Sequence, residues 1–107
     1  MEGLVHLESE DLILDANGYL ATPSRSLVTV DSYGAATSDD LVRINGGSEG
    51  DVIILRAYSS ARIITVKDGT YIQLDGSTDF SLANVYKRLT LMCSSSNIWV
   101  EVSRSNN

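Results

Sequence analysis

The residues able to support nucleophilic chemistry are few. Among 107 residues there is one histidine, His6, and one cysteine, Cys93. A Ser-His-Asp or Cys-His arrangement needs a histidine as its base, and His6 stands near the chain start, where a structural or surface role is expected. Cys93 ends the apolar run Leu89–Cys93, as a buried and unreactive thiol does. Zinc bound by Cys and His needs more of both residues. The sequence therefore predicts no nucleophilic catalysis, no metal and no cofactor.

Carboxylates are more abundant, with fourteen acidic residues in the chain. Two of them flanking a sugar could hydrolyse a glycoside, and Asp75–Asp79 loosely resembles a calcium loop. However, Asp31, Asp68, Asp75 and Asp79 all stand at expected turns, where Asp bonds to its own backbone. The glycines of 46–50 do not lie between a strand and a helix, so they predict a hairpin loop rather than a phosphate loop. We expect a protein that is not an enzyme.

The aromatic residues favour binding over chemistry. Trp99 and Tyr71 lie on the polar sides of their expected strands, and Tyr58 lies in a turn. Exposed aromatic side chains stack on sugar rings or anchor protein interfaces. The candidate ligand-binding residues are Tyr58, Arg62, Tyr71 and Trp99. For Trp99, packing against another subunit is favoured, while a place at the end of the core and ligand stacking stay open.

The overall charge argues against polyanionic partners. The net charge is −6, the pI is about 4.5, and the eight basic residues form no run or stripe. Nucleic-acid binding depends on clustered Lys and Arg, so no nucleic acid is expected, and no anionic membrane surface either. The start lacks the pattern of a signal peptide, and no stretch is long and apolar enough to span a membrane. We expect synthesis in the cytoplasm, without membrane insertion.

The elements that must position these residues are short strands. Apolar runs rich in Val, Ile, Leu, Thr and Tyr are broken by turn residues every eight to twelve positions, a spacing typical of an all-β sandwich or barrel. Asp68-Gly69 is the strongest hairpin signal. The sequence predicts a compact antiparallel β-sandwich or jelly-roll-like barrel over residues 21–107, preceded by a connecting segment or strand at residues 1–20. The expected strands are 12–14, 27–30, 41–44, 52–57, 63–67, 71–74, 80–83, 88–93 and 98–102.

Alternation along the strands predicts their faces. In the last strand Ile98, Val100 and Val102 are expected to face the core, which leaves Trp99 on the outer side. The run 52–55 is apolar on both faces, as in a central strand or one covered by a partner. Val52, Ile54 and Trp99 are therefore the candidate subunit-interface residues.

Several of these runs together resemble the C-terminal β-module of tailed-bacteriophage tail fibres and related virion appendages. In that family a Gly-Asp-x-Ile-x-Leu strand is followed by Thr-Val-Lys-Asp-Gly, a short Ile-x-Leu strand and a closing Trp-x-Glu-x-Ser. The matching runs are 38–47, 50–57, 64–69, 72–74, 79–82 and 99–106. The family often has Gly-Thr-Gly-Asn-Ile after the Asp-Gly turn, and here Gly69–Ile72 is shorter, which puts any function of this loop in doubt.

The resemblance implies a homotrimeric virion protein that contacts other virion proteins and a host-surface glycan. A trimer would also bury the spare apolar surface and the strand edges. Three alternatives stay open: a capsid decoration or trimerisation domain without a ligand, a carbohydrate-binding module, and a small glycan-active enzyme. A piece of a longer fibre protein is also compatible with the sequence.

Overall fold

The computed structural model describes residues 6–107, and no α-helix occurs in this range. Short single-turn 3-10 helices lie at Tyr33–Ala35 and Asp75–Ser77. The strands are β1 (Ser9–Ile13), β2 (Tyr19–Leu20), β3 (Leu27–Asp31), β4 (Ser38–Leu41), β5 (Arg43–Ile44), β6 (Val52–Ala57), β7 (Ile63–Val66), β8 (Ile72–Gln73), β9 (Phe80–Leu82), β10 (Arg88–Ser95) and β11 (Ile98–Ser105). The predicted all-β class is confirmed.

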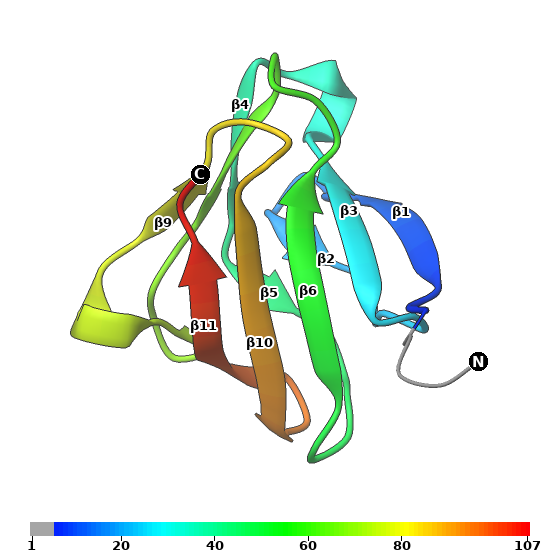
Figure 1. Ribbon diagram of the computed structural model, residues 1–107, viewed down its shortest axis with the longest axis vertical. Helices are drawn as coiled ribbons and strands as arrows, with labels where there is room; N and C mark the ends of the chain where they lie inside the picture. The colour runs from blue at the N-terminus through cyan, green and yellow to red at the C-terminus, as the bar shows by residue number, and fades with distance from the viewer. Residues whose placement is uncertain (1–5) are drawn as a thin grey trace.

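The first two thirds of the chain wind as a short solenoid (Figure 1). Strands β1, β3 and β6 pair in parallel along one face, β2 pairs with β5 on a second, and β4 pairs with β7 on a third. The corners between the faces are also hydrogen-bonded from one turn to the next. The Leu14 amide donates to the Asp31 carbonyl and the Lys67 amide to the Leu41 carbonyl, both at 2.9 Å. The first turn of the chain is thus joined to the second through β1–β3 and β2–β5, and the second turn to the third through β3–β6 and β4–β7.

The last third reverses direction and closes the stack. Strand β9 pairs antiparallel with β7, β10 pairs antiparallel with β6, and β11 pairs antiparallel with β10. The main sheet therefore has the order β1-β3-β6-β10-β11-β8. Since an unpaired β6 edge would invite further strands, the antiparallel return of β10 and β11 caps the solenoid.

One core fills the space between the faces. It is built almost entirely of Leu, Ile and Val, with Phe80 and Trp99 as its aromatic members. The Cα radius of gyration is 12.9 Å, the value expected for a compact domain of this size. Residues 9–20, set apart in the sequence analysis as a connecting segment or strand, form β1 and β2 and give Leu14 and Leu20 to this same core. Residues 1–5 of that segment lie outside the described residues.

The predicted antiparallel sandwich or jelly-roll-like barrel is wrong in its strand pairing. Five of the strand pairings are parallel and three are antiparallel. The turns are where they were expected, but most of them turn the chain through a corner onto the next face instead of reversing it. At Asp68-Gly69 the Asp68 carboxylate accepts the Leu74 amide at 2.8 Å, and β8 pairs with β11 rather than with β7. The strongest hairpin signal is a corner.

Candidate functional site

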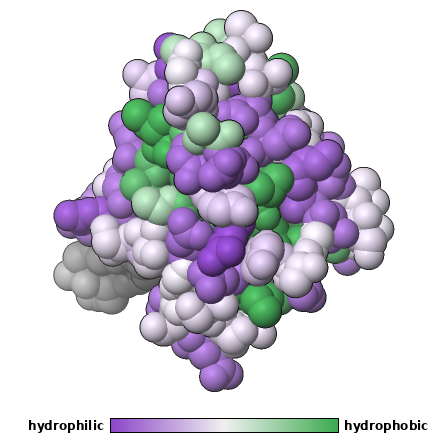
Figure 2. Space-filling model, turned by 180° about the vertical axis from the view of Figure 1, so that it is seen from behind, coloured by the Kyte–Doolittle hydropathy of each residue, from purple (hydrophilic) through white to green (hydrophobic). Residues whose placement is uncertain are grey.

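The outer face of the main sheet gathers most of the exposed side chains that could bind a partner. Strands β6, β10 and β11 lie side by side at the front in Figure 1. Alternation sends Ile53 and Leu55 of β6 into the core and leaves Val52 and Ile54 outward. Figure 2, which shows the molecule from behind, has mostly polar surface between smaller hydrophobic patches.

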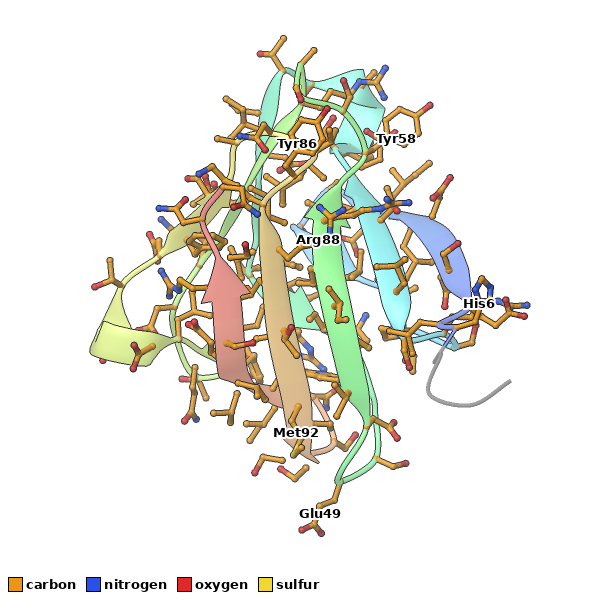
Figure 3. The ribbon with its side chains drawn as sticks, viewed as in Figure 1. His6, Glu49, Tyr58, Tyr86, Arg88 and Met92 are labelled. Carbon is orange, nitrogen blue, oxygen red and sulfur yellow. The ribbon has the colours of Figure 1, made fainter. Side chains whose placement is uncertain are left out.

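One end of this face is apolar. The cross-strand register places Met92 of β10 opposite both Val52 of β6 and Val100 of β11. Their side chains are 39% (Val52), 42% (Met92) and 37% (Val100) exposed, and Val102 beside them is 57% exposed. We call Val52, Met92, Val100 and Val102 the apolar stripe. A groove of about 370 Å³ adjoins three of the four, Met92, Val100 and Val102, and the rest of its lining is Glu49, Gly50, Cys93, Ser94 and Glu101. Figure 3 shows Met92 and Glu49 at this end.

The central position of β6 agrees with the prediction for 52–55, and the outward placement of Val52 and Ile54 keeps both available as interface residues. Ile54 is partly buried and lies opposite Thr90 of β10 and Leu27 of β3. An apolar row across several strands of a sheet is a surface that a protein partner can cover.

The other end of the face carries tyrosines and arginines. Tyr58 directly follows β6 and is 50% exposed, and Tyr86 in the loop before β10 is 69% exposed. Both project at the same end of the molecule as Arg88 (Figure 3). The Ser60 hydroxyl accepts the Val85 amide at 3.2 Å, which ties the loop of Tyr58 to the loop of Tyr86.

Arg62, one of the predicted ligand-binding residues, also lies at this end, but an ion pair already neutralises its charge. Its guanidinium donates to both carboxylate oxygens of Asp31, at 3.0 and 2.9 Å, and lies 5.3 Å from the centre of the Tyr58 ring. A cation over an aromatic face restrains the ring. Arg62 therefore positions Tyr58, and the two predicted residues do lie together.

Two further arginines lie at this end and were not among the predicted residues. Arg56 donates from Nε to the Thr29 hydroxyl at 2.9 Å, and Arg88 donates to the carbonyls of Val85 and Lys87. A shallow hollow of about 270 Å³ lies beside Arg56, lined by Asp11, Thr29, Arg56, Ala57, Tyr58 and Val85. The sequence could have indicated these two arginines, because each stands at the end of an expected strand, next to the loop that carries Tyr58 or Tyr86.

Trp99 is neither a ligand-binding nor an interface residue in this structure, because it is 1% exposed. The predicted faces of β11 are inverted. Trp99 pairs with buried Cys93 across the hairpin, and directly opposed residues share a face. Gly47 leaves room for the indole: a Cβ there would stand 2.6 Å from Trp99 Cζ2. Burial of Trp99 removes the largest apolar side chain of the strand from water and leaves Val100 and Val102 on the outer face.

Tyr71 lies apart from Tyr58 and Arg62. Its ring packs against the Arg43 guanidinium, 4.8 Å from ring centre to Cζ, and Tyr19 packs on the same guanidinium at 5.4 Å. The Tyr19–Arg43–Tyr71 stack runs from one solenoid turn to the next, with Tyr19 opposite Arg43 in the β2–β5 pairing. Of the four predicted ligand-binding residues, Tyr58 and Arg62 lie together. Tyr71 lies elsewhere on the surface, and Trp99 lies in the core.

The reactive residue types stand in structural settings. The Cys93 thiol donates to the Ser95 carbonyl at 3.0 Å, and burial, with a smaller effect of Asp51, raises its pKa. Asp79 pairs with Lys67 at 2.8 Å and accepts the Asp68 amide; the hydrogen bond from Lys67 is the main cause that lowers the Asp79 pKa. His6 is an exposed side chain 3.7 Å from Glu8. Among residues 6–107, no three His, Cys, Asp or Glu side chains group as a metal site would need.

Comparison with known proteins gives no family: no family model matches the chain, and no curated protein matches it significantly. In the part of the chain that the structure describes, no helix has the length and apolarity needed to cross a membrane.

Proposed function

We propose that this chain is a structural module of a tailed-phage virion appendage, which assembles as a homotrimer and attaches to a host-surface glycan. In this proposal it carries out no chemistry of its own and contacts other virion proteins. The motif resemblance from Ser38 to Asn106 supports the phage assignment. The apolar stripe is the single observation that carries the assembly role.

Assembly through the apolar stripe would lower the free energy of the protein. The stripe spans three neighbouring strands in a chain of net charge −6, so its exposure costs free energy that a symmetric partner would recover at about 25 cal/mol per Å² of buried apolar area. In a closed trimer the stripe would pack against a different surface of the next copy around the threefold axis, or meet the other two stripes at that axis. Val52 and Ile54 would lie within that interface.

Light scattering behind size exclusion tests the assembly role. The wild-type chain should elute at three chain masses. The double variant Met92→Glu/Val100→Glu should be a folded monomer, because it places two charges in the contact. The matched control Ile13→Glu/Ile63→Glu, at exposed positions outside the stripe, should stay trimeric. A wild-type monomer at high micromolar concentration contradicts the proposal.

A purely structural role without a ligand, as in a capsid decoration or trimerisation domain, is the second candidate. The apolar stripe supports it equally well, whereas the exposed pair Tyr58 and Tyr86 favours attachment, as it would in a carbohydrate-binding module. Glycan-array binding that is lost in Tyr58→Ala, with the trimer intact, selects the attachment role. A trimer that binds no glycan selects the structural role.

A further inference from the structure

The strands β6 and β10 bring two arginines together at the tyrosine end of the main sheet. Leu55 pairs with Leu89 in the antiparallel register, so the next position along places Arg56 opposite Arg88. Both lie on the outer face, since the neighbouring Leu55 and Leu89 are buried. Like charges directly opposite on neighbouring strands destabilise a sheet. The repulsion between Arg56 and Arg88 therefore needs a negative charge nearby to offset it.

No carboxylate of the described residues forms an ion pair with either arginine. Arg25, Arg62, Lys67 and Arg104 each pair with an Asp or Glu side chain. Arg56 and Arg88 instead bond to a hydroxyl and to backbone carbonyls, through Nε and one terminal nitrogen respectively. A guanidinium has five N–H donors, so each keeps donors free. Neutral oxygens hold the two side chains in place, and neither guanidinium has its positive charge neutralised by an ion pair.

The surroundings suit a sugar. Tyr58 and Tyr86 flank the arginines on two loops that hydrogen bonds restrain: Asn84 Oδ1 accepts the Tyr86 amide at 2.8 Å, and the Arg62 amide donates to the Ser59 carbonyl at 3.1 Å. Loops that are already restrained lose little entropy on binding. The hollow of about 270 Å³ lies just under the size range of small-molecule pockets, which begins at roughly 300 Å³. It would hold one sugar unit and its substituents.

We infer that the tyrosine end binds an acidic saccharide, with Arg56 and Arg88 on the sugar's oxyanion and Tyr58 and Tyr86 against its ring. This inference rests on the proposed function, whose glycan it specifies as anionic. Guanidinium groups bind carboxylate and sulfate through paired, charge-assisted hydrogen bonds. Of these four residues Arg56 and Tyr58 line the hollow, and Arg88 and Tyr86 lie outside it. Asp11 of β1 also lines the hollow and sets the orientation, because its carboxylate repels the oxyanion towards Arg56 and Arg88, on β6 and β10.

Calorimetric titration of the full chain with a polygalacturonate oligosaccharide tests the inference. The methyl-ester form, which is neutral, and a sulfated galactan oligosaccharide are the comparison ligands. The acidic oligosaccharide should bind at least about tenfold more tightly than its ester, and added salt should weaken only the acidic complex. The sulfated ligand tells whether the site takes any sugar oxyanion or the carboxylate alone.

Variants locate the site. Arg56→Gln and Arg88→Gln should each weaken acidic-saccharide binding about tenfold, and Asp11→Asn should strengthen it by removing a like charge. Arg25→Gln, which removes one positive charge elsewhere, is the matched control and should bind as wild type.

Two results would overturn the inference. One is equal binding of the acid and the ester, and the other is unchanged binding by both arginine variants. If only neutral glycans bind to an intact trimer, the inference fails and the proposed function stands. If no saccharide binds, the inference and the attachment role fail together, and light scattering decides the assembly role separately.

Discussion

Gly47 is the residue on which the position of Trp99 depends. Its φ of +93° is one that L side chains rarely adopt, and an added Cβ would stand 2.6 Å from Trp99 Cζ2 and 2.8 Å from Cys93 Sγ. Both the backbone conformation and the contact therefore require glycine. The pair Gly46-Gly47 is visible in the sequence, but nothing in it indicates that an indole ring from a distant strand lies against it.

Gly47→Ala should lower the free energy of unfolding by about 3 kcal/mol, from backbone strain and overpacking together. Gly50→Ala separates the two effects, because Gly50 has a similar φ of +91° and open space around it; it should cost about 1 kcal/mol. Gly69→Ala, at an ordinary φ in open space, should be nearly neutral. Urea unfolding measures all three. Equal losses for Gly47→Ala and Gly50→Ala would show that the indole does not lie against Gly47.

The thiol of Cys93 should be inert in the folded protein. It is 1% exposed, and burial raises its pKa, so little thiolate is available to react. A chromogenic disulfide reagent should react with it in urea at once, and in buffer only as fast as the protein unfolds. Reaction in buffer at the rate of a free thiol would contradict the buried placement.

At the scale of the element, β11 shows what alternation can and cannot predict. The ends of β6 and the start of β10 agree with the sequence prediction. On β11 the period of two holds from Trp99 to Glu101, but the prediction chose the wrong face as the inward one, because the sequence does not show that Trp99 lies opposite buried Cys93. The register shift between Thr90 and Leu91 then ends the alternation near Val102. The inward face carries Glu101, which pattern reasoning assigns to solvent.

Glu101 makes the stability of this strand depend on pH. The Arg104 guanidinium binds both its oxygens at 2.7 Å and is the main cause that lowers the Glu101 pKa; the Asp75 amide adds to this. A carboxyl with a lowered folded-state pKa stabilises the fold above its unfolded pKa and loses that contribution as the pH falls through the folded value. Wild-type unfolding free energy should therefore drop on acidification.

Arg104→Gln tests this element. The variant should be less stable than wild type at about pH 7, and the difference should shrink as acidification protonates Glu101, first in the variant and at lower pH in wild type. Urea unfolding over a series of pH values from neutral to acidic gives the comparison. A difference that stays constant with pH would mean that the contact does not stabilise the ionised carboxylate.

At the scale of the whole molecule, the sequence predicted the class and most of the strands but not how they pair. A turn signal such as Asp68-Gly69 tells where the chain bends, and the same local chemistry serves a hairpin and a solenoid corner. Pairing depends on contacts between distant segments. The same holds for the site: Tyr58 and Arg62 are near in sequence and were predicted together, whereas Arg56 and Arg88 meet only through the β6–β10 register.

The proposed trimer requires the apolar stripe to be an assembly surface between copies of this chain. Sedimentation equilibrium of the unmodified chain over a range of concentrations tests this requirement. A single species of about 35 kDa is expected, three times the chain mass of 11.6 kDa. A species of one chain mass at every concentration, with the fold intact by circular dichroism, would contradict it.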